Sequence, residues 1–511
     1  MESIVAMVHA LPDDRQPVLV ALYESLNAGE YWRNPDILEA HNVFPGACLQ
    51  IGLQLPLHND DDLRAVGDGG YDGRIDEMAE LYKSVKLPVF LRIGYEFDGE
   101  WNGYRPQIYK KAYRRIVDRF REKGADNVAF VWNTYIADNR SAFDWYPDHP
   151  ETGDRDGDRY VDWLSFNTIT PNYAAAWFIG QAAARGKPVM IGESSYAIVK
   201  PTYTFEACTG DFMQMVKTYG IRGYQFINWE WQVYPENAQW HDWANGRFTD
   251  DAALVRHYNA LMEDGSLLFR DAAYHRPAAL FVDCARALTQ REAQEGEMLP
   301  WDRRFDHFTC RDGYDYQVKQ AVVRYGDGWF PFHESMDEEI EVTLRIPPDC
   351  SGYLILNMNI GNGASLAVAD EFVLHLEGDE YELFNRAGGY HKIPIAGHSG
   401  ADGLVTVRLT NKKQGGKVKL TQFGVMVLSG DALPAPKQVQ AEAGSGRIGL
   451  VWEPVEGAYG YNVYKDNQLI AMTENNEYTD LLPGRRPSCY RVSAYDPHRG
   501  EGRLSFEVRS E

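Results

Sequence analysis

Two glutamates stand at comparable places in two apolar segments of the chain. Glu96 ends the segment PVFLRIGYE (88–96), and Glu193 comes near the end of PVMIGES (188–194). A single carboxylate at the end of a strand can cap the next helix or pair with a surface lysine. Two facing carboxylates can hydrolyse an acetal, because one protonates the leaving oxygen while the other attacks the anomeric carbon or activates water. The pair favours this chemistry over two unrelated structural roles.

Other side chains near the ends of the apolar segments fit the same chemistry. Arg92 lies four residues before Glu96, on the same side of an extended strand, and could hold down the pKa of the second carboxylate. A salt bridge with no catalytic part is the alternative. Tryptophan rings at these ends could stack on sugars or pack in a core, and they are Trp101, Trp132, Trp229 and Trp231. Polar groups that could bind sugar hydroxyls, or be purely structural, are Asn133, Asn228 and Glu230.

The segments that must position these residues predict an alternation of strand and helix along the chain. Seven short apolar segments occur at 17–25, 46–55, 88–96, 127–134, 161–168, 188–194 and 223–231. From residue 88 their starts are 39, 34, 27 and 35 residues apart, which suits one strand, one helix and their loops in a parallel sheet. An eighth strand is expected at 3–11, and the clearest helix at 106–124. We therefore expect an α/β fold, a (β/α)8 TIM barrel over residues 1–290, with its active site at the C-terminal ends of the strands.

With these residues in place, the sequence resembles glycoside hydrolase family 26 through most of residues 15–235. RIGYEFDGEWNGY (92–104) is similar to the acid/base segment of that family, and KPVMIGES (187–194) to the strand with its nucleophile. The resemblance implies a retaining glycoside hydrolase with Glu96 as acid/base and Glu193 as nucleophile, their carboxyl groups about 5–5.5 Å apart. It also implies a β-linked polysaccharide or oligosaccharide as substrate, most often mannan.

Two positions depart from the family pattern. Tyr95 stands where the family normally has histidine before the acid/base, and Asn167 and Thr168 stand near the sixth strand of the barrel, where a tyrosine is expected. We count Tyr95 and Asn167 with Arg92 as substrate-binding residues. Because these positions lie beside the reactive sugar, a neighbouring family that acts on β-glucan, β-xylan or algal galactan stays open. A non-catalytic carbohydrate-binding protein on the same barrel is a further alternative, which the presence of both glutamates disfavours.

Beyond the barrel the chain predicts two all-β sandwich domains. Residues 300–430 read as short strands of a jelly-roll or carbohydrate-binding-like domain, which either binds sugar through Trp329, Phe330 or Tyr353 or is a spacer. Residues 434–511 resemble a fibronectin type III domain through Trp452, GYNVY (460–464) and CYRVSAYD (489–496). Such modules are generally spacers in these enzymes. They favour a secreted or periplasmic protein, although no signal peptide is visible in this chain.

Composition excludes several other classes of protein. The formal net charge of −23 disfavours nucleic acid as a partner, and no apolar run is long enough for a membrane helix. We find no motif for a cofactor or a metal, and we interpret DHPETGDRDGDRY (148–160) as a solvated turn rather than a calcium loop. The six scattered cysteines are interpreted as mostly buried thiols. We expect a monomer that needs no cofactor.

Overall fold

The computed structural model describes most of the first 274 residues and the main strands of the rest. The described residues are 4, 7–8, 10–26, 36–169, 175–196, 204–229, 246–274, 278–283, 307–310, 339–345, 351–357, 371–376, 378–384, 390–395, 404–412, 422–428, 430–444, 446–481 and 487–510. Among the predicted site residues, Glu230 lies outside these ranges, as do Trp231, Trp329 and Phe330.

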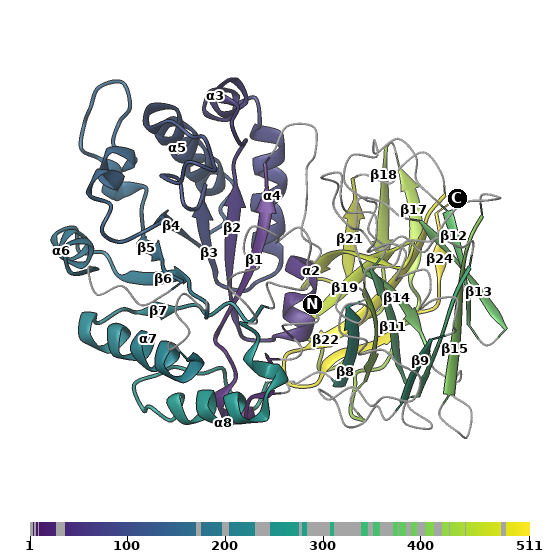
Figure 1. Cartoon of the computed structure of the whole chain (residues 1–511). Coiled ribbons are helices and arrows are strands. Elements are labelled where there is room, and N and C mark those ends of the chain that lie inside the picture. Colours follow the sequence, from purple (N-terminus) through teal and green to yellow (C-terminus); the bar gives the residue numbers. More distant parts are fainter. Residues whose placement is uncertain are drawn as a thin grey trace.

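The first part of the chain is built on a parallel sheet of seven strands in sequence order (Figure 1). The strands are β1 (Leu19–Ser25), β2 (Cys48–Gln54), β3 (Val89–Ile93), β4 (Val128–Thr134), β5 (Trp163–Asn167), β6 (Val189–Glu193) and β7 (Gly223–Tyr224). Each predicted apolar segment contains one of them, so the seven strands are confirmed. The order of parallel strands fits a TIM-barrel-like α/β fold.

Helices connect these strands and cover the sheet. They are α2 (Asp36–Val43), α3 (Asp60–Asp68), α4 (Asp72–Ser84), α5 (Pro106–Glu122), α6 (Ala176–Ala184), α7 (Phe205–Tyr219) and α8 (Ala252–Leu261), with a short 3-10 helix η2 (Arg140–Trp145). The predicted helix at 106–124 is α5, and its apolar face of Tyr109, Tyr113, Ile116, Val117 and Phe120 is buried as its spacing requires. Gly124, with a φ of 65°, follows this helix.

The predicted eighth strand at 3–11 is wrong. The described residues Ile4, Met7, Val8 and Ala10 are helical, and Val8 and Leu11 are buried. Ile4, Val8 and Leu11 are spaced four and three residues apart, so a helix brings all three to one face. An apolar run of this length cannot by itself distinguish a strand from a buried helix. Within the described residues, β1 and β7 are therefore the two edges of the sheet.

The described residues after 278 that lie in regular elements form only strands, arranged in three sheets. The first, in the order β13-β12-β15-β10-β9, uses β9 (His307–Cys310), β10 (Glu339–Arg345), β12 (Glu371–Leu376), β13 (Asp379–Phe384) and β15 (Leu404–Asn411). The second, β17-β18-β21, uses β17 (Gln440–Gly444), β18 (Arg447–Val451) and β21 (Glu477–Asp480). All-β structure after the parallel sheet is thus confirmed.

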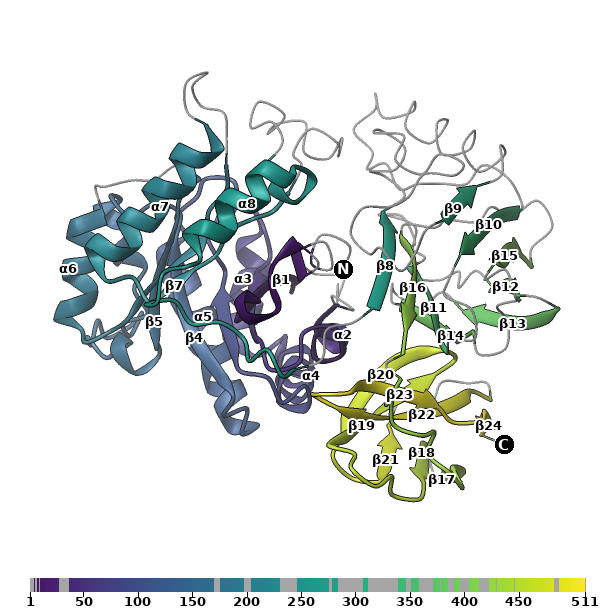
Figure 2. The same cartoon turned by 90° about the horizontal axis from the view of Figure 1, so that it is seen from below.

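The third and largest sheet joins strands from distant parts of the sequence (Figure 2). Its order is β23-β22-β19-β20-β14-β11-β16-β8, with β24 (Val508–Arg509) beside β22. The strands are β8 (Ala278–Asp283), β11 (Gly352–Asn357), β14 (Tyr390–Pro394), β16 (Gln422–Val427), β19 (Gly460–Lys465), β20 (Gln468–Thr473), β22 (Cys489–Asp496) and β23 (Gly500–Leu504). Because β8 pairs with β16 and β20 bridges to β14, this sheet crosses the predicted boundaries. The division at 290, 300, 430 and 434 stays a prediction.

Several predicted features are placed by the described residues. Tyr353 is buried and donates its hydroxyl to the carbonyl of Gly502, so it is not a sugar-binding surface, contrary to one alternative considered above. Cys48, Cys208 and Cys489 are free thiols, and of these only Cys208 is fully buried. No helix in the described ranges is both long and apolar enough to cross a membrane.

Candidate active site

Glu96 lies just beyond the C-terminal end of β3, in a backbone conformation that is rare for a residue with a side chain. Its φ is 52°, in the left-handed region. The turn is held from two sides, because the Glu96 amide donates to the carbonyl of Asn133 at 2.9 Å and the Asn102 side chain donates to the Glu96 carbonyl at 2.7 Å. Strain of this kind persists where surrounding contacts enforce it, and it concentrates at functional sites.

The carboxyl group of Glu96 has an environment suited to an acid. Asn167 Nδ2 donates to its Oε1 at 2.8 Å and Trp101 Nε1 donates to its Oε2 at 3.1 Å. Burial, followed by the charge of Glu193, raises the pKa of Glu96 from 4.5 to about 7, although both hydrogen bonds and Arg92 act in the opposite direction. Glu96 can therefore hold a proton near neutral pH.

Glu193 ends β6 and is paired with a buried cation. Arg92 Nη1 donates to Glu193 Oε1 at 2.7 Å, and the arginine side chain is fully buried while the glutamate is 13% exposed. Tyr23 on β1 forms a further hydrogen bond to the Glu193 carboxylate. Burial lowers the pKa of Arg92, but the interactions with Glu193 and Tyr23 together outweigh burial and the pKa is raised, so Arg92 remains a cation. The rings of Tyr23 and Tyr95 flank this guanidinium, at 5.6 and 5.2 Å.

A chain of hydrogen bonds connects the two carboxylates across β3, β4, β5 and β6. From Glu193 it runs through Arg92, whose Nη1 also donates to Asn133 Oδ1 at 3.3 Å. Asn133 Nδ2 donates to Asn167 Oδ1 at 3.1 Å, and Asn167 donates to Glu96. The predicted residues Arg92, Asn133 and Asn167 thus belong to one site, but Asn133 is fully buried and fixes other side chains, so its predicted contact with sugar is corrected to a positioning role.

The predicted tryptophans divide into a surface residue and a core residue. Trp101 is 48% exposed, and its ring meets that of Tyr135, itself 43% exposed, edge to face at 4.6 Å. Trp132 is fully buried among aromatic rings, with Phe97 at 4.7 Å and Phe143 at 4.9 Å. The prediction that Trp132 stacks on sugar is therefore wrong, because a strand residue facing the surrounding helices cannot reach the cleft.

Two predicted residues lie beyond β7. Asn228 is buried and donates to Thr249 Oγ1 at 3.1 Å, and Trp229 is half-buried. Their predicted contacts with sugar stay predictions.

The aspartates of the predicted turn at 148–160 accept hydrogen bonds from protein donors, Asp154 from Thr152 and Asp156 from Arg114. In the described parts of the chain, no group of three or more acidic, histidine or cysteine side chains could hold a metal ion.

Sequence reasoning missed several residues of the site. Tyr23, which contacts Glu193, lies near the C-terminal end of a predicted strand. A polar side chain at such a position is itself an indication of an active-site residue. Asp98 accepts from Thr134 Oγ1 at 2.6 Å, from the Tyr135 amide at 2.8 Å and from Asn139 Nδ2 at 2.6 Å. Asp98 thereby ties the loop after β3, which carries Trp101, to the loop after β4, which carries Tyr135.

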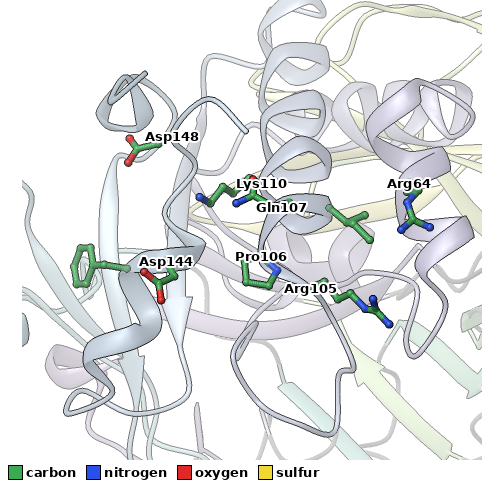
Figure 3. Close-up of a pocket in the computed structure, with 9 residues that line it drawn as sticks. Arg64, Arg105, Pro106, Gln107, Lys110, Asp144 and Asp148 are labelled. Atoms are coloured by element: carbon green, nitrogen blue, oxygen red, sulfur yellow. The ribbon is translucent and has the colours of Figure 1, made fainter. Parts of the chain in front are cut away.

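A separate hollow of about 640 Å³ lies among the residues that follow β2, β3 and β4 (Figure 3). Its walls are Arg64, Arg105, Pro106, Gln107, Ile108, Lys110, Phe143, Asp144 and Asp148. Neither glutamate lines it, and Arg105 and Arg64 are occupied in ion pairs with Asp60. The chemistry of the site therefore belongs to the carboxylates and not to this hollow.

Comparison with curated proteins finds relatives of part of the chain. A β-1,3-xylanase of a Vibrio species, TXYA, is 28% identical over 243 residues, which are 41% of this chain and 48% of that protein. A β-1,3-xylanase of an Alcaligenes species is 27% identical over 244 residues, 41% of this chain and 47% of that protein. The chain thus spans about half the length of these curated relatives.

Among solved structures, a GH26 β-mannanase from Bacteroides ovatus aligns with a TM-score of 0.37 and 16% identity, covering 52% of this chain and 84% of that one. Family comparison matches residues 70–197, which include both glutamates together with Arg92, Asn133 and Asn167. This segment of the chain is a match to Glycosyl hydrolase family 26.

Proposed function

We propose that the chain is a retaining glycoside hydrolase that cleaves a β-linked polysaccharide, with Glu96 as acid/base and Glu193 as nucleophile. The observation that carries the proposal is the contrast between the two carboxyl groups. Glu96 has a pKa raised to about 7, whereas Glu193 is paired with the buried Arg92 cation. One site thus holds a proton donor and an anion, as double displacement at an acetal requires.

In the first step, a carboxylate oxygen of Glu193 attacks the anomeric carbon while Glu96 protonates the departing glycosidic oxygen. The bond to the leaving sugar breaks and a covalent glycosyl-enzyme forms. In the second step, Glu96, now ionised, takes a proton from water, whose oxygen attacks the same carbon and releases Glu193. The anomeric configuration is retained because it is inverted twice.

The substrate is proposed from two kinds of support. The curated relatives are named β-1,3-xylanases, which makes β-1,3-xylan the first candidate, and mannan follows from the family resemblance. The exposed pair of Trp101 and Tyr135 beside Glu96 offers a ring surface for the sugar that leaves. Neutral sugars suit such a surface.

The remainder of the proposal concerns the C-terminal strands. The sheet β17-β18-β21 and the strands β20-β19-β22 share a core that includes Trp452, Tyr461, Val463 and Val492. This arrangement supports a fibronectin type III-like module, and with it a secreted or periplasmic protein.

The roles are tested with Glu193→Ala and Glu96→Ala, and with Glu100→Ala as an exposed control in the same loop. Glu193→Ala should form no glycosyl-enzyme, and azide should restore turnover with inverted product. Glu96→Ala should slow polysaccharide cleavage by about 10²–10⁴-fold, spare the first step for substrates with good leaving groups, and give a retained azide product. Exchanged stereochemistry would reverse the roles, and full activity in either variant would remove that residue from the mechanism.

The substrate is tested with the purified protein on β-1,3-xylan, β-mannan, mixed-linkage β-glucan and algal galactan, with product sizes measured by mass spectrometry. Binding without products from any of these would favour the non-catalytic alternative.

A further inference from the structure

Helix α2 lies at the junction between the parallel sheet and the C-terminal strands (Figures 1 and 2). In sequence it comes between β1, with Tyr23, and β2. Seven of its eight residues are buried, from Ile37 to Val43, and they include the polar side chains of Glu39, His41 and Asn42. A helix that is buried on all sides must find partners for such groups in the elements around it.

Three charged side chains from distant parts of the chain meet at this helix. Lys392 Nζ on β14 lies 2.7 Å from Glu39 Oε2 on α2 and 2.7 Å from Glu501 Oε2 on β23. The side chain of Lys392 is 1% exposed, that of Glu39 is 4% exposed and that of Glu501 is 1% exposed. We call Glu39, Lys392 and Glu501 the buried ion cluster. Charges so far from water are costly unless each is paired and hydrogen-bonded.

The charges of the cluster are balanced by its neighbours. Burial would raise the pKa of Glu501, but Lys392, together with hydrogen bonds from Ser493 and Tyr464, outweighs burial and the pKa is lowered. Burial lowers the pKa of Lys392, yet the two glutamates raise it overall. Burial raises the pKa of Glu39 despite Lys392. Tyr464 and Ser493 donate to Glu501, and Asn42 donates to Glu39, so both carboxyl groups have further partners from α2, β19 and β22.

A second set of hydrogen bonds joins the same elements beside the cluster. Asn462 on β19 contacts His41 Nε2 through its Oδ1 at 2.7 Å, and its Nδ2 donates to Asn42 Oδ1 at 3.0 Å and to Ser493 Oγ at 3.3 Å. The His41 ring also meets Tyr495 edge to face at 4.7 Å. Such contacts have strict geometry, so the C-terminal strands can dock on α2 in only one register.

Another ion pair between the same parts of the chain provides a contrast. Lys86 and Glu474 approach to 3.6 Å, but their side chains are 47% and 53% exposed. A pair in this position is screened by water and contributes little. The chain therefore offers two lysines that bridge the same regions, one buried and one exposed.

We propose that the buried ion cluster locks the C-terminal strands onto helix α2, so that the parallel sheet and these C-terminal strands unfold as one cooperative unit. The C-terminal strands are then a structural part of the protein that carries the active site, rather than a spacer. This inference stands apart from the catalytic proposal, because it is measured by folding and not by activity.

The test uses the full-length chain and compares Lys392→Met with Lys86→Met. By calorimetry, the unmodified protein should unfold in one transition. Lys392→Met leaves two buried carboxyl groups facing each other without a cation, so it should lower the melting temperature by about 5 °C or more, or divide the transition in two. Lys86→Met should leave the transition unchanged.

Glu39→Gln provides a milder variant, because it keeps the pair of Lys392 and Glu501 and removes only the charge on α2. Amide hydrogen exchange at pH 7 should become at least about tenfold faster in both 36–43 and 500–504. Faster exchange in α2 alone would mean that the cluster serves only the helix, and it would overturn the proposal. Separate transitions in the unmodified protein, or equal effects of Lys392→Met and Lys86→Met, would overturn it as well.

Discussion

Glu96 and Glu193 are identical side chains, and their surroundings make them chemically different. Glu96 is half-buried, accepts from the neutral donors Asn167 and Trp101 and lies in the field of a second carboxylate, whereas Glu193 accepts from a guanidinium and a phenol. Catalysis by two carboxylates depends on such a contrast, because one group must give up a proton while the other stays an anion. The identity of the residues predicts the chemistry, and their partners support the proposed roles.

The pH dependence follows from the raised pKa of Glu96. The acid must be protonated in the first step. With a pKa of about 7, Glu96 keeps its proton up to about that pH, whereas a glutamate with the ordinary pKa of 4.5 would already have lost its proton well below pH 7. We expect kcat/KM on polysaccharide to fall as pH rises through about 7, and the fall to be absent in the first step of aryl glycosides with good leaving groups.

The same argument predicts how Glu96 responds when the second carboxylate is neutralised. The charge of Glu193 is the second cause of the raised pKa, so Glu193→Gln should lower the pKa of Glu96. Titration of the Glu96 carboxyl carbon by NMR would measure it in both proteins. An unchanged pKa in the variant would mean that burial alone sets the value.

Tyr23 should matter for the proposed nucleophile, Glu193, although the tyrosine cannot itself attack. Burial and then the charge of Glu193 raise its pKa well above 10, so its hydroxyl keeps its proton and donates to the carboxylate. Loss of a hydrogen bond to a charged group costs about 1.5–3 kcal/mol, so Tyr23→Phe should lower kcat/KM by about 10–150-fold. The exposed Tyr459→Phe is the control. Equal activity of both variants would contradict this role.

At the scale of elements, the strands approach closely enough that the site depends on the absence of a side chain at Gly192 on β6. A Cβ there would lie 2.6 Å from Ser165 Oγ, 2.8 Å from Asn167 Oδ1 and 2.9 Å from Asn133 Nδ2. Alanine must therefore displace the amides that connect the carboxylates. We expect Gly192→Ala to destabilise the protein by about 1–3 kcal/mol and to lower kcat.

Gly180 on helix α6 provides the matched control, because nothing lies within 4 Å of the position of its Cβ. Gly180→Ala should stabilise the protein by up to about 1 kcal/mol, as alanine favours a helix. Chemical denaturation and initial rates measure both variants. Normal kcat in Gly192→Ala would show that the amide network tolerates rearrangement.

The elements themselves were largely predictable from local sequence. Seven continuous apolar runs with helices between them specify a parallel sheet, and the face of α5 follows from spacing alone. The segment at 3–11 was not predictable, because its short apolar run fits either element. Trp132 was misinterpreted for a related reason. The alternation of a strand tells which residues share a side, but not whether that side faces the cleft or the helices.

The site was predictable where its residues share one strand or carry a family motif, as Arg92, Glu96 and Glu193 do. Tyr23 was missed because its partner lies at the far side of the sheet in sequence order, on β6. The contact of Asn133 with Asn167 depends on the register between β4 and β5, which pairs Asn133 with Ser165. Such contacts belong to the tertiary structure and leave no local pattern.

At the scale of the whole molecule, the sheets share more than a covalent connection. One buried cluster of apolar residues includes Leu49 and Ile51 of β2 together with Tyr353 and Ile355 of β11 and Tyr464 of β19. Apolar burial of this kind is non-directional and would accept several orientations. The hydrogen bonds around the buried ion cluster have strict geometry, which selects one orientation of the C-terminal strands.

The net charge of −23 acts on every substrate that approaches. An acidic molecule repels sulfated or carboxylated polysaccharides over a distance set by salt, roughly 30 Å at 0.01 M and 8 Å at 0.15 M ionic strength.

We therefore expect cleavage of a neutral β-linked polysaccharide to be nearly independent of salt. For a sulfated or carboxylated derivative of the same polymer, kcat/KM should be lower at 0.01 M and should rise severalfold towards 0.15 M. The measurement is the ratio of the two kcat/KM values at each salt concentration, with the neutral polymer as internal control for effects of salt on the protein. A preference for the acidic polymer at low salt would instead mean that a local basic surface outweighs the overall charge, and the residues around Arg105 and Lys110 at the N-terminus of α5 would be the first place to seek it.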